Sequence, residues 1–99
     1  MMVSKENIIA IRPDPSDAED FPVSVAGLER AQMGRRIRKL RNRLGLSQEA
    51  FAATYGIPLA SIRQYEIGRN MPPPAVRAYL KVIDAEPELV ARTVAERAA

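Results

Sequence analysis

The chain lacks the residues on which most enzyme and metal chemistry depends. Its 99 residues include no cysteine and no histidine. Without cysteine there is neither a disulfide framework nor a thiolate metal site. Without histidine the commonest general base and the commonest metal ligand are missing. We also find no phosphate-binding glycine loop. The sequence therefore predicts a protein that is not an enzyme and that needs no cofactor or metal.

Long apolar runs are missing as well. No stretch is long enough to span a membrane, and no signal-peptide pattern opens the chain. We therefore expect a cytoplasmic location with no membrane partner. The length supports one small domain.

Basic residues are scarce in the first part of the chain, and acidic residues are the minority in the rest. Residues 1–29 hold two basic and six acidic residues, a net charge of −4, whereas residues 30–99 hold 13 basic and six acidic residues, a net charge of +7. The basic part predicts an anionic partner, and the acidic part predicts a separate role.

Residues 1–27 are predicted to form an acidic, flexible N-terminal arm, extended or disordered. Two prolines and an acidic run, 14–20, interrupt its few apolar residues. Such a composition cannot offset its own ordering entropy. The arm is either a tail without a role or a segment that folds on a protein partner, with apolar anchors at Ile8, Ile9, Ile11 or Phe21.

Residues 28–99 are predicted to form the folded domain, which begins with a helix over 28–44. Met33, Ile37, Leu40 and Leu44 fall on one face of this helix. Seven basic residues and no acid lie between positions 30 and 43. Because like charges on one helix repel, contact with phosphates explains them better than a solvated face. Arg38 is one of the residues we assign to DNA phosphates.

The stretch 46–70 predicts two short helices joined by a tight turn. Ser47 is a suitable N-cap, and Gly56 suits the left-handed end of the first helix. Pro58 suits the first turn of the second helix, and Gly68 closes it. Ile62 and Tyr65, extended by Ile67, form an apolar stripe on the second helix. Two helices around a glycine-containing turn are the helix-turn-helix pattern.

The other face of the second helix carries short or hydrogen-bonding side chains. Such side chains can contact base edges in a DNA major groove, although a solvated face is the open alternative. The residues are Leu59, Ala60, Ser61, Arg63 and Gln64.

Two further helices are predicted after the prolines at 72–74. They cover residues 75–84 and roughly 86–98, and the last one either caps the core or forms a homodimer contact. The predicted fold is thus all-α, with five helices and no strand.

Residues 35–83 resemble the phage repressor/Cro type of helix-turn-helix protein, often called the XRE family. The resemblance is carried by LGLSQE over 44–49, by IRQYE over 62–66, by Gly68-Arg69 and by Pro72. It implies that the second helix of the motif enters the major groove. It implies base reading by Leu59, Ala60 and Gln64, with Arg63 beside them. It implies backbone contacts from Ser47, Gln48, Ser61, Arg69 and Asn70, and a structural salt bridge between Arg41 and Glu66.

The segment 70–94 is similar to HigA-type antitoxins of type II toxin–antitoxin systems. This similarity implies a homodimer that binds a double-stranded DNA operator, represses its own operon and holds a small RNase-type toxin. The acidic arm would suit a basic toxin surface. The alternative is a stand-alone regulator of the XRE type with no toxin.

Overall fold

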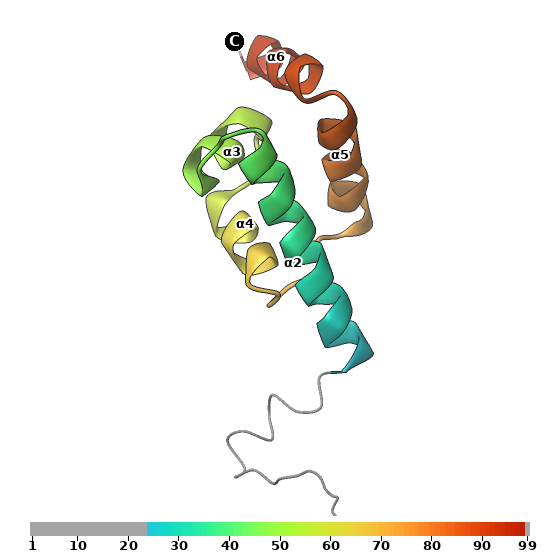
Figure 1. The fold of residues 1–99 in the computed structure, drawn as a ribbon. Coiled ribbons are helices and arrows are strands. Elements are labelled where there is room, and N and C mark those ends of the chain that lie inside the picture. The colour runs from blue at the N-terminus through green and yellow to red at the C-terminus, as the bar shows by residue number, and fades with distance from the viewer. Residues whose placement is uncertain (1–23, 99) are drawn as a thin grey trace, which may run out of the picture.

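The computed structural model describes residues 24–98, and within that range it contains five helices and no strand. The predicted all-α, five-helix fold is therefore confirmed. Figure 1 shows the helices, which are α2 (Val25–Arg43), α3 (Gln48–Tyr55), α4 (Leu59–Glu66), α5 (Pro74–Ala85) and α6 (Pro87–Ala98). None of the helices in this range is both long and apolar enough to cross a membrane.

The first helix begins earlier than predicted. It starts at Val25 rather than at residue 28, because the hydroxyl of Ser24 accepts a hydrogen bond of 2.9 Å from the backbone N–H of Gly27. A serine N-cap of this kind satisfies a donor that the helix itself leaves unpaired. The four apolar anchors predicted in the arm, Ile8, Ile9, Ile11 and Phe21, lie outside the described residues.

Local sequence signals set the bounds of the two short helices. Ser47 caps α3 by accepting a 3.0 Å hydrogen bond from Ala50, and Gly56 ends α3 with a φ of 70°. Pro58 occupies the N-cap position of α4 and not the first helical turn. Its carbonyl accepts hydrogen bonds from the backbone N–H groups of Ser61 and Ile62.

Every helix contributes at least one residue to a single core. Ile37, Phe51, Ile62 and Ile83 are no more than 2% exposed and come from α2, α3, α4 and α5 in turn, while α6 adds the buried Val90. Met33 and Leu44 are partly buried against this core, as their spacing predicts. Ile67 departs from the prediction, because α4 ends at Glu66 and leaves Ile67 66% exposed.

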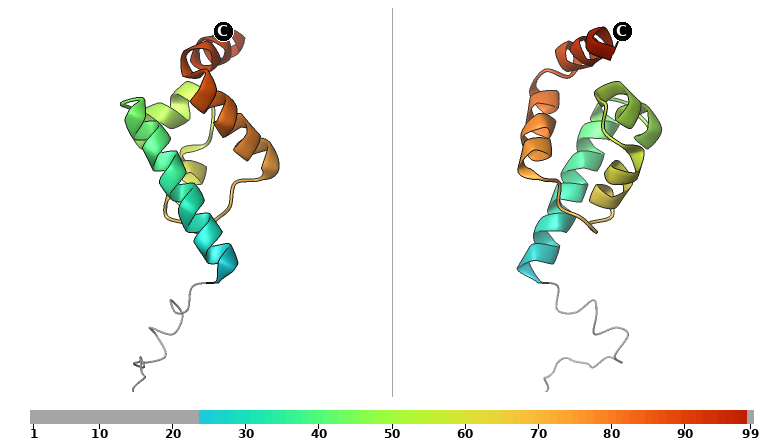
Figure 2. Two further views of the ribbon diagram at one scale, coloured as in Figure 1. Left: turned by 45° about the vertical axis from the view of Figure 1, so that its right-hand side comes forward. Right: turned by 180° about the vertical axis from the view of Figure 1, so that it is seen from behind.

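The long helix α2 separates two parts of the domain. In Figure 1 and in the right-hand view of Figure 2, α4 lies on one side of α2 and α5 lies on the other. α2 packs against α4, α3 packs against α4 and α6, and α5 packs against α6. Two tyrosine hydroxyls link these helices. That of Tyr79 donates to the carbonyl of Tyr55 (2.7 Å), and that of Tyr55 donates to the carbonyl of Pro87 (3.0 Å).

Candidate nucleic-acid interface

The helix α4 divides its side chains between the core and the surface. Ile62, Tyr65 and Glu66 are buried, whereas Ala60 and Arg63 are exposed and Leu59, Ser61 and Gln64 are intermediate. Leu59 also packs against the core. Ala60, Ser61 and Gln64 therefore form the outer face of this helix, with Leu59 at its edge.

The predicted reading residues come together with part of the segment that follows α4. Ala60, Ser61 and Gln64 line a shallow hollow with Asn70, Met71 and Pro73. The backbone N–H groups of Arg69 and Asn70 both approach the carbonyl of Gln64, at 3.0 and 3.5 Å. This segment therefore turns back onto α4 and places two exposed polar side chains, those of Arg69 and Asn70, close to the outer face.

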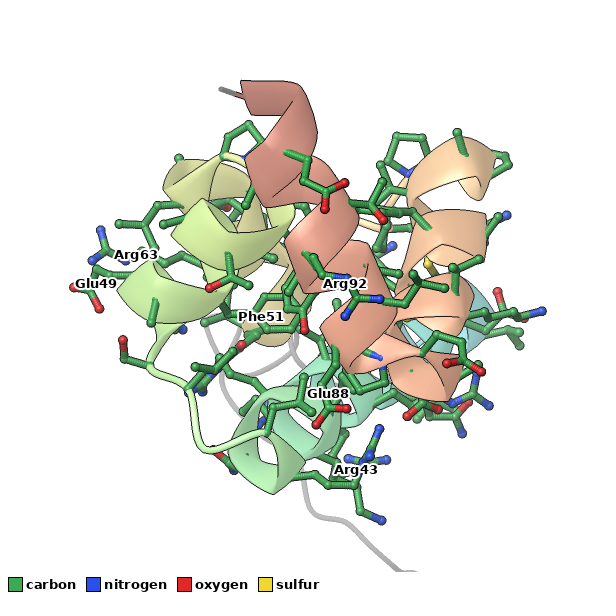
Figure 3. The ribbon with its side chains drawn as sticks, turned by 90° about the horizontal axis from the view of Figure 1, so that it is seen from above. Arg43, Glu49, Phe51, Arg63, Glu88 and Arg92 are labelled. Atoms are coloured by element: carbon green, nitrogen blue, oxygen red, sulfur yellow. The ribbon has the colours of Figure 1, made fainter. Side chains whose placement is uncertain are left out.

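Arg63 lies apart from that hollow. Its guanidinium contacts the carboxylate of Glu49 on α3 at 3.4 Å, and Figure 3 shows the two side chains together at the outer edge of the domain. Both side chains are more than half exposed, so the ion pair adds little to the stability of the domain. Arg63 can therefore leave Glu49 and bind another anion. Ser47 is also exposed, at the start of α3.

The buried carboxylate of Glu66 organises the opposite side of α4. Arg41 binds it through two hydrogen bonds, from Nε to Oε2 (2.8 Å) and from Nη2 to Oε1 (3.1 Å). The amide of Gln48 donates to Oε1 at 3.0 Å. Arg41 also reaches the carbonyl of Leu46 at 3.0 Å. Because Glu66 is only 4% exposed, this carboxylate has its compensating charge and its hydrogen bonds inside the domain.

The ion pair shifts the protonation equilibrium of Arg41. Hydrogen bonding to Glu66 raises the pKa of the Arg41 guanidinium above its usual range, while its burial acts in the opposite direction. The ion pair therefore favours the charged form of the guanidinium.

Two more arginines of α2 bind backbone carbonyls at the C-terminal end of α4 and just after it. Arg38 donates through Nη1 to the backbone carbonyl of Glu66, and Arg30 donates through Nε to that of Gly68 at 3.0 Å. The last carbonyls of a helix have no partner within it and carry partial negative charge, so cations are favourable there. Arg30, Arg38 and Arg41 thus hold the end of α4 against α2.

This arrangement changes the interpretation of the basic run on α2. Four of its seven basic residues bind groups of the protein itself, namely the three arginines at α4 and Arg43, which pairs with Asp84. The remaining three, Arg35, Arg36 and Lys39, are exposed. Most of the run therefore has partners inside the domain.

The close approach of α2 and α4 depends on Gly34. A Cβ atom at this position would lie 2.6 Å from the carbonyl oxygen of Tyr65 and 2.7 Å from that of Glu66. Sequence reasoning missed this residue, although a glycine inside a helix is itself a signal of close approach. Among residues 24–98, no group of three acidic, cysteine or histidine side chains could hold a metal ion.

The comparisons with known proteins agree with this geometry. Residues 32–93 match the family model described as "Helix-turn-helix domain", a range that reaches from α2 into α6 and covers more than half of the chain. No curated protein and no solved structure gives a match. By the family model, the chain belongs to the helix-turn-helix domain family of DNA-binding proteins.

Proposed function

We propose that this chain is a sequence-specific transcriptional repressor that places α4 in the major groove of double-stranded DNA. The observation that carries the proposal is the division of α4 into two sides. One side is fixed by Glu66 and the arginines of α2, while the other offers Ala60, Ser61 and Gln64 to solvent. A preorganised helix with small and hydrogen-bonding side chains on its outer face fits direct readout of base edges.

In this proposal the contacts divide into reading and positioning. The amide of Gln64 pairs with a base edge, and Ala60 leaves room for a thymine methyl group. Leu59 and Arg63 flank these two, with Arg63 leaving Glu49 when DNA is bound. Ser47, Ser61, Arg69 and Asn70 contact the phosphate backbone. The amide of Gln48 and the guanidinium of Arg38 act through Glu66, as positioning residues rather than as primary phosphate contacts.

The operator is proposed to be a pseudo-palindrome bound by a homodimer. Two reading helices would then lie one helical turn apart, about 34–36 Å. DNase footprinting together with sedimentation tests this part, because a monomer would protect only one half-site.

The reading role of Gln64 is tested by selection from a random duplex library. Wild-type protein should enrich one sequence, and Gln64→Ala should enrich a more degenerate one. Gln32→Ala is the matched control, because Gln32 is an exposed glutamine on α2 that does not line the hollow at Gln64. An unchanged selected sequence with Gln64→Ala would contradict the proposal.

The finer proposal is that the repressor is an autoregulating antitoxin. Its support is the similarity of residues 70–94 to HigA-type antitoxins and the acidic composition of residues 1–23, which hold two basic and five acidic residues. The partner would be a small basic RNase-type toxin bound through Ile8, Ile9, Ile11 or Phe21. The alternative is a stand-alone regulator.

A pull-down from native lysate separates these two functions. Full-length protein should hold a small basic protein that a chain lacking residues 1–23 loses, while both retain DNA. Recovery of DNA alone by both proteins would leave the stand-alone regulator.

A further inference from the structure

A face of α2 next to the one that contacts α4 forms a groove with α5. Met33, Ile37 and Leu40 of α2 and Leu80 of α5 are its apolar lining, and Arg36, Arg77, Lys81 and Asp84 are the polar lining. Its volume is about 240 Å³, which is room for an aliphatic side chain. The groove exists because α5 packs against α6 rather than closely against α2.

The charge along the groove is predominantly positive. Its one acid, Asp84, is already paired with Arg43. The guanidinium of Arg77 donates to the carbonyl of Pro72, a neutral group that leaves its charge uncompensated. Arg36 and Lys81 are exposed. The surface thus combines an apolar floor with three cations, which suits an occupant that carries an aliphatic side chain beside several carboxylates.

We propose that the chain's own segment 11–20 binds in this groove. The segment contains Asp14, Asp17, Glu19 and Asp20, and its only basic residue, Arg12, lies at the end next to Ile11. In the bound arrangement Ile11 covers the apolar floor, and the carboxylates of Asp14 and Asp17 pair with Arg36, Arg77 and Lys81.

The length of the connection supports this occupant. Counted from Ser24, Ile37 and Leu40 lie 13 and 16 residues along α2, which is about 20–24 Å at 1.5 Å per residue. Ile11 lies 13 residues before Ser24, and a flexible chain of that length has a root-mean-square span of about 20 Å. Asp17, seven residues before Ser24, spans about 15 Å, which corresponds to the stretch between Met33 and Arg36.

The covalent connection between the segment and α2 also makes a weak contact sufficient, because binding is intramolecular. A connection of this length gives an effective concentration in the millimolar range, so a contact of millimolar affinity is substantially occupied. A protein that binds residues 11–20 would then have to displace them from the groove. The proposal itself is independent of whether the protein is a repressor or an antitoxin.

Paramagnetic relaxation in the full-length protein tests the contact. Because the chain has no cysteine, Ser16→Cys gives a single site for a nitroxide label and keeps every acidic residue of the segment. We expect the backbone amides of Arg36, Arg77 and Lys81 to broaden several-fold more than that of Ile67. Ile67 is the control position for simple proximity. Its neighbour Gly68 lies against Ala31, which is closer to Ser24 along α2 than the groove residues are.

Charge reversal provides the matched control. Arg36→Glu should remove most of the broadening at Lys81, and so should 0.5 M NaCl, which shortens the screening length to about 4 Å. Arg35→Glu makes the same change of charge on an exposed neighbour that does not line the groove, and it should leave the broadening in place.

Three outcomes would overturn the proposal. The first is broadening that depends only on distance from Ser24, with Ile67 affected as strongly as Lys81. The second is an equal loss with Arg35→Glu and Arg36→Glu. The third is broadening between spin-labelled and isotope-labelled molecules in a mixed sample, which would place the segment of one molecule on another.

Discussion

Replacing Gly34 with alanine should destabilise the domain, although alanine favours helices more than glycine does. The substitution improves helix propensity by about 1 kcal/mol in an unconstrained helix. Here the new Cβ atom would lie 2.6 Å from the carbonyl oxygen of Tyr65 and 2.7 Å from that of Glu66. Both atoms belong to the backbone, so a side-chain rotation cannot relieve the contact.

The expected size follows from the two opposing terms. Overpacking of a close contact costs about 1–3 kcal/mol, and occasionally more. Moving α2 away from α4 would also lengthen the hydrogen bonds of Arg38 and Arg41 to Glu66. Subtracting the gain in propensity leaves about 0–2 kcal/mol. Because the lengthened hydrogen bonds add to the cost, we expect the free energy of unfolding to fall by about 1–2 kcal/mol.

Urea denaturation followed by circular dichroism measures this change. With a slope of about 1–2 kcal/mol per molar urea, the midpoint should fall by about 1 M. Gly27→Ala is the control, because Gly27 lies in the first turn of the same helix and lacks a positive φ. The control should leave the midpoint unchanged or raise it. If Gly34→Ala behaves like Gly27→Ala, the close crossing of α2 and α4 is refuted.

Three further predictions concern the contacts around α4 and α5. Glu66→Ala leaves the largely buried Arg41 charge without its carboxylate and should cost about 3–5 kcal/mol in urea denaturation; a loss below 1 kcal/mol would contradict the importance of the pair. Arg38→Ala should weaken DNA binding without changing the slope of log K against log salt, because Arg38 donates to the Glu66 carbonyl; a slope that falls by about 1 would instead identify a phosphate contact. Burial raises the pKa of the Tyr79 hydroxyl above its ordinary value of 10.0. The folded state therefore disfavours the phenolate, and the free energy of unfolding should fall as the pH rises above about 10. Tyr79→Phe should reduce that loss in alkaline denaturation, and an unchanged pH dependence would argue against the burial effect.

The sequence was sufficient for the fold because its signals are local. Ser47 and Gly56 bound α3 through their own backbone and hydroxyl chemistry, which needs no tertiary information. The spacing of Met33, Ile37, Leu40 and Leu44 identifies the buried face of α2, because a helix repeats every 3.6 residues. The start of α2 was predicted three residues late, since Ser24 is followed by an exposed valine that carries no periodic signal.

The partners of the basic residues could not be predicted in the same way. Arg30, Arg38 and Arg41 bind carbonyls and a carboxylate that lie 25 to 38 residues away in the sequence. A run of like charge indicates that anionic groups are nearby, but it does not distinguish a DNA phosphate from the end of a helix. The Arg41–Glu66 pair was expected only through the family resemblance. The contact of Arg38 inside the domain could not be predicted, because its acceptor is a backbone carbonyl, which no sequence pattern reveals.

The two ends of α4 are held in different ways, and this bears on how it would read DNA. A helix of eight residues is marginal by itself, so its orientation depends on its neighbours. At its C-terminal end the carbonyls and the carboxylate of Glu66 bind Arg38, Arg41 and Gln48. At its N-terminal end Pro58 gives no side-chain cap, and the helix is held there by the apolar packing of Ile57, Leu59 and Ile62.

Because of this difference, we expect Ala60 and Gln64 on the proposed reading face to differ in how well they tolerate substitution. Ala60 lies in the first turn, which is held by apolar packing and not by side-chain hydrogen bonds, so that a small shift of the helix can accommodate a different base step. Gln64 lies one turn later, two residues before the fixed Glu66. A positional error there cannot be absorbed by the backbone, and a bidentate amide needs correct geometry to distinguish bases. Substitutions of Ala60 should therefore change affinity gradually, whereas substitutions of Gln64 should change which base is selected.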